Sequence, residues 1–469
     1  MIAELKPYAE YKKSGLPWLG QVPGNWVIKR GKSYLVSIDE RSKRGREELL
    51  TVSSARGVVP RSSANVTMFK AESYAGHKLC WPGDLVINSL WAWAGGLGVS
   101  QHHGIISTAY SVYRSRPSAQ INHRFLHELV RSSAFHWELQ VRSKGVWISR
   151  LQLTDTAFLD APIPLPPPDE QAAIVRFLDW ATGKLERAIR AKRKVITLLG
   201  EQKQAIIHRA VTRGLDPSAP LKPSGIPWLS DIPQHWEMRK IKSLVKTFGG
   251  MTPNKGVERY WTGRTPWVSP KDMKAPEIFD SKDHISDAAL EETNIAVISA
   301  PAVLIVVRGM ILARTFPTAV TRVPVAINQD MKALVPRPEL SVDYFSLILT
   351  GIQRELLELV QIAGHGTCCL RTDSWSAFCL PIPPLEEQEV IRRFLSDELA
   401  TTNTAISRLE REIELLREYR TRLVADVVTG KLDVREAAAR LPVEAAPDTV
   451  EDDTDLSLDP EAADEEAAV

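Results

Sequence analysis

Cysteines and long apolar runs are both scarce in this chain. Its four cysteines, Cys80, Cys368, Cys369 and Cys379, show no C-x-x-C spacing. They are therefore expected to be reduced structural thiols, not ligands of zinc or members of a disulfide framework. No run of about 18 apolar residues is present, and the first 15 residues lack the apolar core of a signal peptide. We expect a cytoplasmic protein without a membrane span.

Catalytic and cofactor-binding motifs are also missing. The sequence contains neither a G-x-x-x-x-G-K-[ST] loop nor a G-x-G-x-x-G turn after a strand. It also lacks the N-P-P-[YF] motif expected where a DNA methyltransferase holds a flipped base. His123 and His127 have the i, i+4 spacing of metal ligands, but no convincing third ligand lies near them in sequence. The sequence predicts no catalytic residue, no metal and no cofactor in this chain.

The charge is divided unevenly along the chain. Residues 441–469 hold eleven acids and no Lys or Arg, so the net charge of +2 for the whole chain becomes +13 for residues 1–440. Lysines and arginines that neutralise phosphates gain free energy from counterion release, so this excess favours a nucleic-acid partner. A role in solubility alone is the alternative. The end of the chain, 436–469, has the composition of a disordered acidic tail.

One short motif occurs twice, 210 residues apart. "SGLPWLGQVPGNW" (14–26) and "SGIPWLSDIPQHW" (224–236) share seven of thirteen residues, where composition alone predicts about one match in fifteen. This match indicates an internal duplication with two arms, residues 1–26 and 216–236. The shared tryptophans are predicted to anchor the arms on the helices or on a partner: Trp18, Trp26, Trp228 and Trp236.

A second motif repeats with an offset of 217 residues. "PIPLPPPDEQAAIVRFLD" (162–179) and "PIPPLEEQEVIRRFLSD" (381–397) share a Glu-Gln pair and several residues after it. A proline run cannot form helix interior, and the acids that follow it suit a helix N-terminus. Gly214 and Gly430 match the C-terminal ends of such helices. We therefore expect two helices of about 40 to 45 residues, roughly 60 to 67 Å long.

Both predicted helices carry an apolar heptad pattern that favours a coiled coil. Lys192, Lys203 and Arg420 interrupt this pattern, so parts of the seam are expected to be solvated or held by a partner. The apolar residues predicted to form the seam are Leu178, Leu185, Ile189, Ile196, Leu199, Ile206, Leu395, Leu399, Ile406, Leu409, Ile413, Leu416 and Leu423.

Two dissimilar stretches lie between the repeated motifs, residues 27–160 and 237–378. Each mixes strand signals, such as "GDLVINS" (83–89) and "RGMILAR" (308–314), with helical signals such as "NHRFLHELVRSSAFHWELQ" and "VDYFSLILTGIQRELLELV". The predicted fold class is mixed α/β. It has two globular domains separated by two long antiparallel coiled-coil helices (161–215 and 379–435), and an internal duplication gives it pseudo-two-fold symmetry.

The Pro-Trp-Leu arm and the P-I-P…E-Q helix start, each present twice, resemble the specificity subunits of type I restriction-modification systems. The resemblance covers nearly the whole chain up to about residue 435. It implies that residues 27–160 and 237–378 are target recognition domains, and that the paired helices form an antiparallel spacer between them. Each domain would then read one half of an asymmetric, bipartite site in double-stranded DNA.

Partners follow from the same resemblance. Two modification subunits would bind S-adenosylmethionine and methylate adenine, and restriction subunits would use ATP and Mg²⁺ to translocate and cut DNA. This chain would direct that phage-defence chemistry without performing it. Two other classes stay open on the sequence alone: a stand-alone DNA-modifying enzyme, and a coiled-coil protein scaffold without DNA specificity.

The second domain carries the more detailed resemblance. "FGGMTPNKGVERYWTGRTPWVSPKDM" (248–273), "NQDMKALVP" (328–336) and "GHGT" (364–367) resemble recognition-domain motifs, although Met251 interrupts the usual G-G-T-P and His365 departs from G-S-T. Forked cations and amides suit base edges, and small polar or basic side chains suit phosphates. On these grounds the predicted DNA contacts are Thr252, Asn254, Lys255, Ser269, Lys271, Arg314, Asn328 and Gln329 in the second domain, and Lys43, Arg44, Arg56, Arg61, Asn88, Ser89 and Lys144 in the first.

Trp91 and Trp93 form a further aromatic pair in "SLWAWAGG". Two tryptophans two residues apart on a strand share one face, and we expect that face to be buried. Exposed stacking platforms are the alternative.

Overall fold

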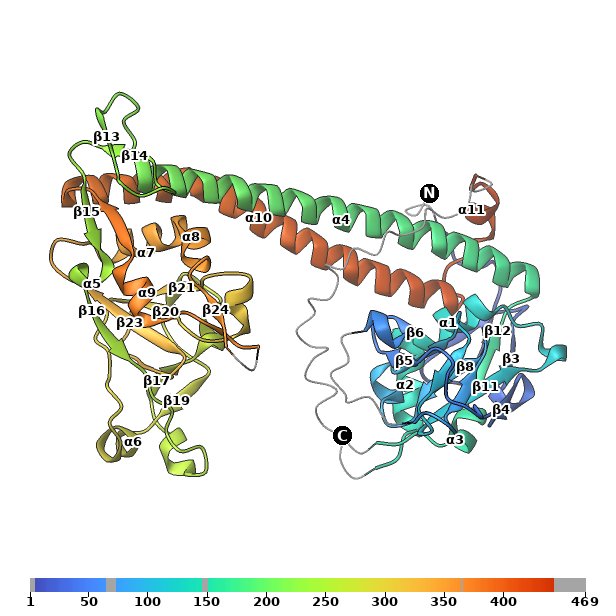
Figure 1. Ribbon diagram of the computed structural model, residues 1–469. Coiled ribbons are helices and arrows are strands. Elements are labelled where there is room, and N and C mark those ends of the chain that lie inside the picture. Colours follow the sequence, from blue (N-terminus) through green and yellow to red (C-terminus); the bar gives the residue numbers. More distant parts are fainter. Residues whose placement is uncertain (1–4, 65–72, 146–150, 364–365, 443–469) are drawn as a thin grey trace. The chain divides into compact units, whose positions relative to one another are not determined.

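The computed structural model describes most of the chain: residues 5–64, 73–145, 151–363 and 366–442. The chain folds as two compact units, one made of Met1–Ala191 with Arg411–Val469 and the other of Lys192–Glu410. The division falls inside two long helices, α4 (Pro168–Arg213) and α10 (Leu385–Val428). Each unit therefore combines one arm, one globular domain and half of each long helix (Figure 1).

An antiparallel sheet in the order β4-β11-β8-β9 forms the centre of the first globular domain. Side chains alternate across its strands, so Leu85 and Ile87 pack beneath the helices while Val86 faces the small pairs β5–β6 and β7–β10 on the other side. The strands of this unit are β1 (Tyr11–Lys13), β2 (Gln21–Pro23), β3 (Val27–Arg30), β4 (Leu35–Ile38), β5 (Leu50–Ser53), β6 (Gly57–Pro60), β7 (Lys78–Cys80), β8 (Leu85–Asn88), β9 (Leu97–Val99), β10 (Gly104–Ile106), β11 (Tyr110–Ser115) and β12 (Pro162–Leu165).

Three short helices complete the first domain: α1 (His123–Arg131), α2 (Ser133–Arg142) and α3 (Asp155–Leu159). Asn122 and Ser132 cap α1 and α2, each accepting from backbone N–H groups of the first turn. The expected helical segment around 122–140 is thus two helices. "GDLVINS" contains the strand β8, as predicted.

The second domain is built on a five-stranded sheet in the order β16-β23-β20-β21-β18, beside a three-stranded sheet in the order β19-β17-β22. Helices α7 and α8 share its core with the strand β20, all of whose residues are buried. Besides the long helices, the described α-helices and strands of the second unit are β13 (Leu221–Pro223), β14 (Asp231–Pro233), β15 (Glu237–Lys240), α5 (Ile241–Leu244), β16 (Val245–Gly249), β17 (Thr265–Val268), β18 (Glu277–Ile278), β19 (Asp283–Ile285), α6 (Asp287–Glu292), β20 (Ala302–Val306), β21 (Thr318–Thr321), β22 (Ala326–Ile327), β23 (Met331–Pro336), α7 (Val342–Gly351), α8 (Gln353–Leu357), β24 (Gln361–Ile362), β25 (Cys368–Cys369), α9 (Thr372–Ala377) and β26 (Cys379–Ile382).

One strand expected in this domain is wrong. "RGMILAR" forms the 3-10 turn η9 (Met310–Ala313), which starts at Gly309 with φ +139. The preceding strand ends at Val306, and the apolar run 310–313 joins no sheet; the Met310 side chain is 64% exposed.

Both long helices begin and end where the sequence predicts. α4 starts at Pro168, the last residue of the proline run, and stops before Gly214, whose φ is +72, while α10 stops at Val428, two residues before Gly430 with φ +76. This left-handed backbone costs a glycine little, so it terminates a helix without strain. The 46 residues of α4 correspond to about 69 Å.

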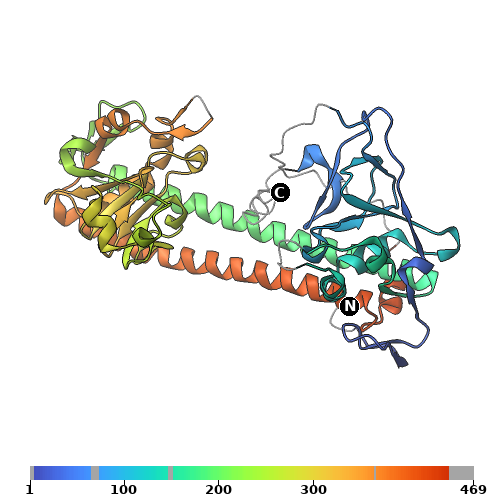
Figure 2. The same ribbon diagram turned by 90° about the horizontal axis from the view of Figure 1, so that it is seen from below.

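Within each unit the halves of α4 and α10 lie side by side (Figures 1 and 2). The start of α4 meets the end of α10 in the first unit, and the end of α4 meets the start of α10 in the second, which is the expected antiparallel arrangement. All thirteen predicted seam residues are buried or half-buried. Polar seam residues are paired: Glu186 accepts from Arg420 in the first unit, and Lys203 donates to Asn403 at 2.8 Å in the second.

The chain stays folded beyond the predicted start of the acidic tail. Residues 435–439 form α11 (Arg435–Ala439), and Ala437, Ala438 and Leu441 are buried in the first unit. The tail boundary at 436 is therefore corrected, because these apolar residues pack before the acids begin; the remainder, 443–469, lies outside the described residues. Among the helices described, each is too short or too polar to cross a membrane.

Candidate nucleic-acid interface

The first arm is joined to the start of α4 through Glu170. This carboxylate is 4% exposed and accepts from Trp26 Nε1 at 2.6 Å, from Tyr8 Oη at 2.7 Å and from Asn25 Nδ2 at 2.8 Å. Burial, together with the bond to Glu170, raises the pKa of the Tyr8 hydroxyl, which stays a proton donor. The two repeated motifs thus meet each other in space.

The second unit repeats this junction with its own residues. Trp236 Nε1 donates to Glu387 Oε2 at 3.0 Å, and His235 Nε2 lies 2.6 Å from the same oxygen. The predicted anchors Trp26 and Trp236 are both completely buried. Each ring also lies close to the glycine that follows a long helix: a Cβ would lie 3.2 Å from the Trp26 ring at Gly430, and 3.3 Å from the Trp236 ring at Gly214.

The glutamine of each Glu-Gln pair connects the long helix to the globular domain. Gln171 Oε1 accepts from the backbone of Asn122, the residue that caps α1, at 2.7 Å. In the second unit Gln388 Oε1 accepts from the backbone of Ser341, which caps α7, at 2.8 Å. Each glutamine also donates to the carbonyl of a proline five residues before it. The repeat therefore fixes how each domain is attached to its helix start.

The other two predicted anchors pack on the globular domains. Trp18 meets Phe135 edge-on with ring centroids 5.4 Å apart, and Trp228 stacks on Phe378 at 5.5 Å. Both tryptophans are half-buried. They hold the arms against the globular domains, whereas the sequence predicted anchorage on the long helices or on a partner.

In the second domain three loops come together and carry five of the predicted DNA contacts. Backbone bonds from Met251 to Ile327 and from Asn328 to Val268 join the segments 250–252, 268–272 and 327–329. Gly250 has no room for a side chain, because a Cβ there would lie 1.9 Å from the Asn328 carbonyl oxygen. We call these three segments the second-domain loop cluster; its predicted contacts are Thr252, Ser269, Lys271, Asn328 and Gln329.

Side chains in this cluster fall into two groups. Ser269 and Asn328 are buried and bond within their own loops, to Asp272 and to the backbone of Asp330, so they shape the loops from behind. Lys271 and Gln329 are exposed, and Thr252 is hydrogen-bonded to Gln329. The exposed members have the cationic and amide groups that phosphates and base edges require.

Three further predicted residues of this domain lie outside the cluster proper. Asn254 and Lys255 are exposed on the loop that follows it, where Asn254 Oδ1 accepts from Gly256 N at 2.9 Å. Arg314 is exposed just after η9, on a different surface loop.

In the first domain Arg56 lies in the turn of the β5–β6 hairpin, and Arg61 follows β6 at the other end of the hairpin. Arg56 Nη2 donates to the carbonyl of Ser63 at 2.6 Å, which ties the hairpin turn to the 3-10 turn η3 (Arg61–Ser63). Lys43 and Arg44 are exposed on a separate turn that Ser42 Oγ closes by accepting from Gly45 N.

The remaining predicted contacts of the first domain lie near the end of β8. Ser89 is buried, with its hydroxyl 3.3 Å from that of Ser111, which places it inside the domain; Asn88 is half-buried beside it. Leu153 N donates to the Ser89 carbonyl, and the neighbouring Gln152 pairs with the exposed Lys144.

Trp91 and Trp93 are not on a strand, so the expectation of a shared buried strand face is wrong. Trp91 directly precedes the 3-10 turn η4 (Ala92–Ala94) and Trp93 lies inside it; both are half-buried and stack with ring centroids 5.8 Å apart. Strand β8 ends before both residues, at Asn88, and Gly95, with φ +86, ends the 3-10 turn. Arg131 on α1 also contacts this loop, and sequence reasoning missed it because its partners are backbone carbonyls, which leave no sequence signal.

His127 is held neutral inside the first domain. Its Nδ1 accepts from Val99 N at 3.2 Å, and among the described residues no cluster of three His, Cys, Asp or Glu is arranged for a metal ion. Burial, aided by Arg131 and Arg124, lowers the pKa of His127 from 6.5 to about 4.

This depressed pKa predicts acid sensitivity of the first unit. Below about pH 6.5 the unfolded chain binds a proton that the folded imidazole does not. The contribution of His127 to stability is therefore complete above that pH and is lost as the pH falls towards 4. We expect H127L to be less stable at pH 7.5 but to lose less stability between pH 6.5 and 4, measured by urea denaturation at each pH. Parallel losses in the two proteins would contradict the assignment.

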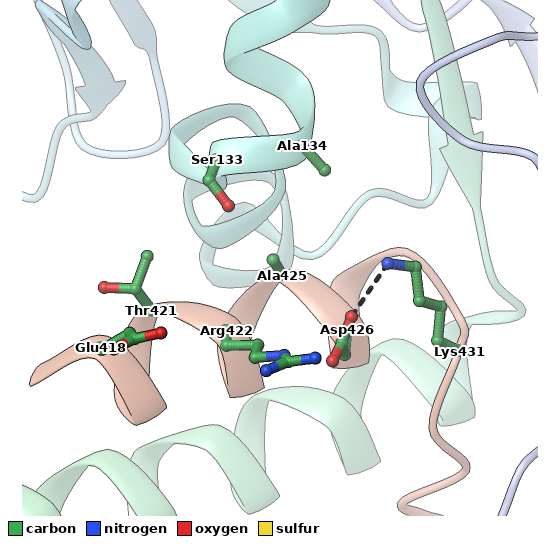
Figure 3. Close-up of a pocket in the computed structure, with 8 residues that line it drawn as sticks. All are labelled: Ser133, Ala134, Glu418, Thr421, Arg422, Ala425, Asp426 and Lys431. Carbon is green, nitrogen blue, oxygen red and sulfur yellow. Dashed lines mark hydrogen bonds and ion pairs between the residues drawn. The ribbon is translucent and has the colours of Figure 1, made fainter. Parts of the chain in front are cut away.

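An open hollow of about 800 Å³ lies between the start of α2 and the end of α10, within the first unit (Figure 3). Lys431 Nζ lies 3.0 Å from Asp426 Oδ1 there, and Arg422 is accompanied by Glu418. Its positive and negative groups balance, unlike the exposed cations and amides of the loop cluster. The lining residues are Ser133, Ala134, Glu418, Thr421, Arg422, Ala425, Asp426 and Lys431.

Comparison with known proteins agrees with this geometry. Residues 233–415 match the family described as type I restriction modification DNA specificity domain. The type I restriction enzyme EcoR124I/EcoR124II specificity subunit of Escherichia coli is 32% identical over 180 residues, which cover 38% of this chain and 45% of that protein. The MjaIX specificity subunit of Methanocaldococcus jannaschii is 28% identical over 173 residues, 36% of this chain and 39% of that one. The matched segments thus span less than half the length of these two relatives.

The fold match extends much further than the sequence match. A chain from a structure concerned with complex assembly and conformational transition of a type I restriction-modification system superimposes with a TM-score of 0.61, covering 88% of this chain and 99% of that one at 18% identity. The matched fold therefore includes residues of both units of this chain. Residues 233–415 are thus similar to the DNA specificity domain of type I restriction-modification systems, and the resemblance to specificity subunits that the repeated motifs predicted is confirmed.

Proposed function

We propose that this chain is the DNA-recognition subunit of a type I restriction-modification complex, and that each globular domain reads one half of a bipartite, asymmetric site. The proposal rests chiefly on one observation. Two equivalent junctions, Trp26–Glu170 with Gln171 and Trp236–Glu387 with Gln388, attach two differently folded domains to equivalent helix starts. A repeated frame with unlike domains suits a target whose halves differ in sequence.

The second-domain loop cluster is proposed to meet the bases and phosphates of one half-site. Gln329 has a bifunctional amide suited to adenine, and Lys271 has a point charge suited to phosphate. Buried Ser269 and Asn328 hold these neighbours in place. In the first domain the exposed Arg56 is proposed to serve the other half-site, together with Arg61 at the other end of the same hairpin.

Catalysis is proposed to belong to partner subunits. By the family resemblance these are two modification subunits that use S-adenosylmethionine, and restriction subunits that use ATP and Mg²⁺. The two junctions would give the modification subunits two equivalent places to dock. The chain itself is proposed to have no catalytic residue and to act in the cytoplasm.

Mapping of methylated adenines tests this function directly. The chain is co-expressed with its modification subunit, and host DNA is read by single-molecule sequencing with and without the chain. We expect a bipartite asymmetric motif that disappears when the chain is removed. Methylation that is unchanged by its removal, or produced by the purified chain alone, would contradict the proposal.

Phosphate contacts and base contacts are expected to respond differently to substitution. In the assembled complex K271A is expected to reduce the slope of log K against log salt by about 1 with the sequence preference unchanged. Q329A is expected to cost about 1–3 kcal/mol at one base pair of the site, about a 5- to 150-fold loss of preference there. The exposed Lys242 on α5 provides the control, because K242A should change neither. Filter binding over a salt series measures both effects. Equal effects from K242A would contradict the assignment of Lys271 to phosphate and Gln329 to a base edge.

A further inference from the structure

Arg131, at the end of α1, has its guanidinium turned inward onto the backbone of two loops. Nη2 donates to the carbonyls of Ser54 and Ala55 at 2.7 and 2.8 Å. Nη1 donates to Leu97 O at 2.7 Å, with longer contacts of 3.5 and 3.4 Å to Ser53 and Gly95. Burial lowers the pKa of Arg131, a cost that these carbonyl bonds offset. One side chain thus ties the turn of the β5–β6 hairpin to the loop after η4.

The backbone of the hairpin is also pressed closely onto α1 and β9. At Gly57 the φ is +76, and a Cβ would lie 3.0 Å from a ring carbon of His127. A Cβ on Gly98 of β9 would in turn lie 3.1 Å from the Gly57 Cα. Two glycines therefore face each other where the hairpin crosses β9, and larger residues at either position would push the hairpin away.

Beyond this anchorage the hairpin turn is open to solvent. Ser54, Ala55 and Arg56 are exposed, while Gly57 and Val58 directly after them are buried. Arg56 lies one residue from the carbonyl that Arg131 holds, and its own guanidinium reaches Ser63. A forked cation reads a base edge only when its backbone is fixed to within a fraction of an ångström.

We propose that Arg131 is a positioning residue for recognition of the first half-site: it clamps the β5–β6 turn so that Arg56 is presented to DNA in one orientation. This inference rests on the proposed function, and it adds that selectivity at this half-site depends on a side chain that touches no DNA. The three short bonds all go to main-chain carbonyls. The clamp therefore does not depend on the side chains of Ser54 and Ala55.

The first test uses R131K in the intact chain, because lysine keeps the charge but has no fork to span both loops. Amide exchange measured by mass spectrometry is expected to rise at least tenfold for residues 53–57 and 95–97, with β8 and β11 unchanged. In the complex, preference for the correct first half-site is expected to fall at least tenfold with the second half-site unaffected. Adding R56A to R131K should then cost little, whereas R56A alone should cost at least tenfold.

A second variant approaches the same clamp from its other side. G57A leaves Arg131 intact but displaces the hairpin, and it should reproduce the selective loss at the first half-site. R124Q is the matched control on α1, because Arg124 pairs with the exposed Asp179 at 2.6 Å and contacts neither loop. Unchanged exchange in R131K, additive losses for R131K and R56A, or normal half-site preference in G57A would each overturn the proposal. A wild-type complex without sequence preference would instead refute the proposed function, and amide exchange would still show whether the clamp exists.

Discussion

Replacing Glu170 by leucine is expected to lower the free energy of unfolding of the first unit by about 3–5 kcal/mol, the cost of breaking a buried charged network by removing one partner. The leucine would leave Trp26 Nε1, Tyr8 Oη and Asn25 Nδ2 without their shared acceptor. Each buried donor left unpaired costs about 1–3 kcal/mol. Amide exchange of the intact chain measures this loss, because peptides from the second unit serve as an internal reference.

The neighbouring carboxylate separates this junction from a general helix-terminus effect. Asp169 lies in the same first turn of α4 but is exposed, so D169L should cost at most about 1 kcal/mol through the lost helix-dipole interaction. E387L should be milder than E170L, since the Glu387 side chain is 28% exposed and water can replace part of what is lost. Equal losses from E170L and D169L would show that the arm junction contributes little.

The repeated motifs predicted the arms and the two long helices because their signals act locally in the sequence. Proline runs, first-turn acids and terminal glycines act on the backbone within a few residues, and α4 and α10 begin and end as those signals predict. The sequence did not predict the partners of these first-turn acids. Glu170 was interpreted through the helix dipole alone, and its main partner, Trp26, is 144 residues away. Both residues occur in both repeats, and that joint recurrence was the available signal.

The candidate site was harder to predict because exposure depends on packing that sequence does not display. Ser89, Ser269 and Asn328 look like ligand-binding residues by type, but they are buried and bonded within their own domains. Arg131 looks like any surface arginine of an amphipathic helix, and its carbonyl partners belong to residues of any type. The stacked Trp91 and Trp93 depend on a turn at Gly95 that alternation alone does not signal.

Exchanging residues 237–378 for the recognition domain of another specificity subunit is expected to replace one half of the methylated motif and to leave the other half unchanged. The chain enters and leaves this domain through the paired strands β15 and β26, with Glu237 opposite Ile382 and Lys240 opposite Cys379. Because the two ends of the domain are adjacent, another domain can replace it without changing the distance between the segments that flank it.

The size of the effect follows from the additivity of base-pair mismatches. Each wrong base pair costs about 1–3 kcal/mol, so methylation at the original second half-site should fall at least about thirtyfold once two or more base pairs differ. Gln388 gives the internal control, since its side chain must still accept from a backbone N–H at the start of the donor domain's helix equivalent to α7, as it does at Ser341. Q388A in the hybrid should weaken selection at the new half-site only. If both halves of the motif change after the exchange, the two domains do not read DNA independently, and the duplicated junctions do not isolate one domain from the other.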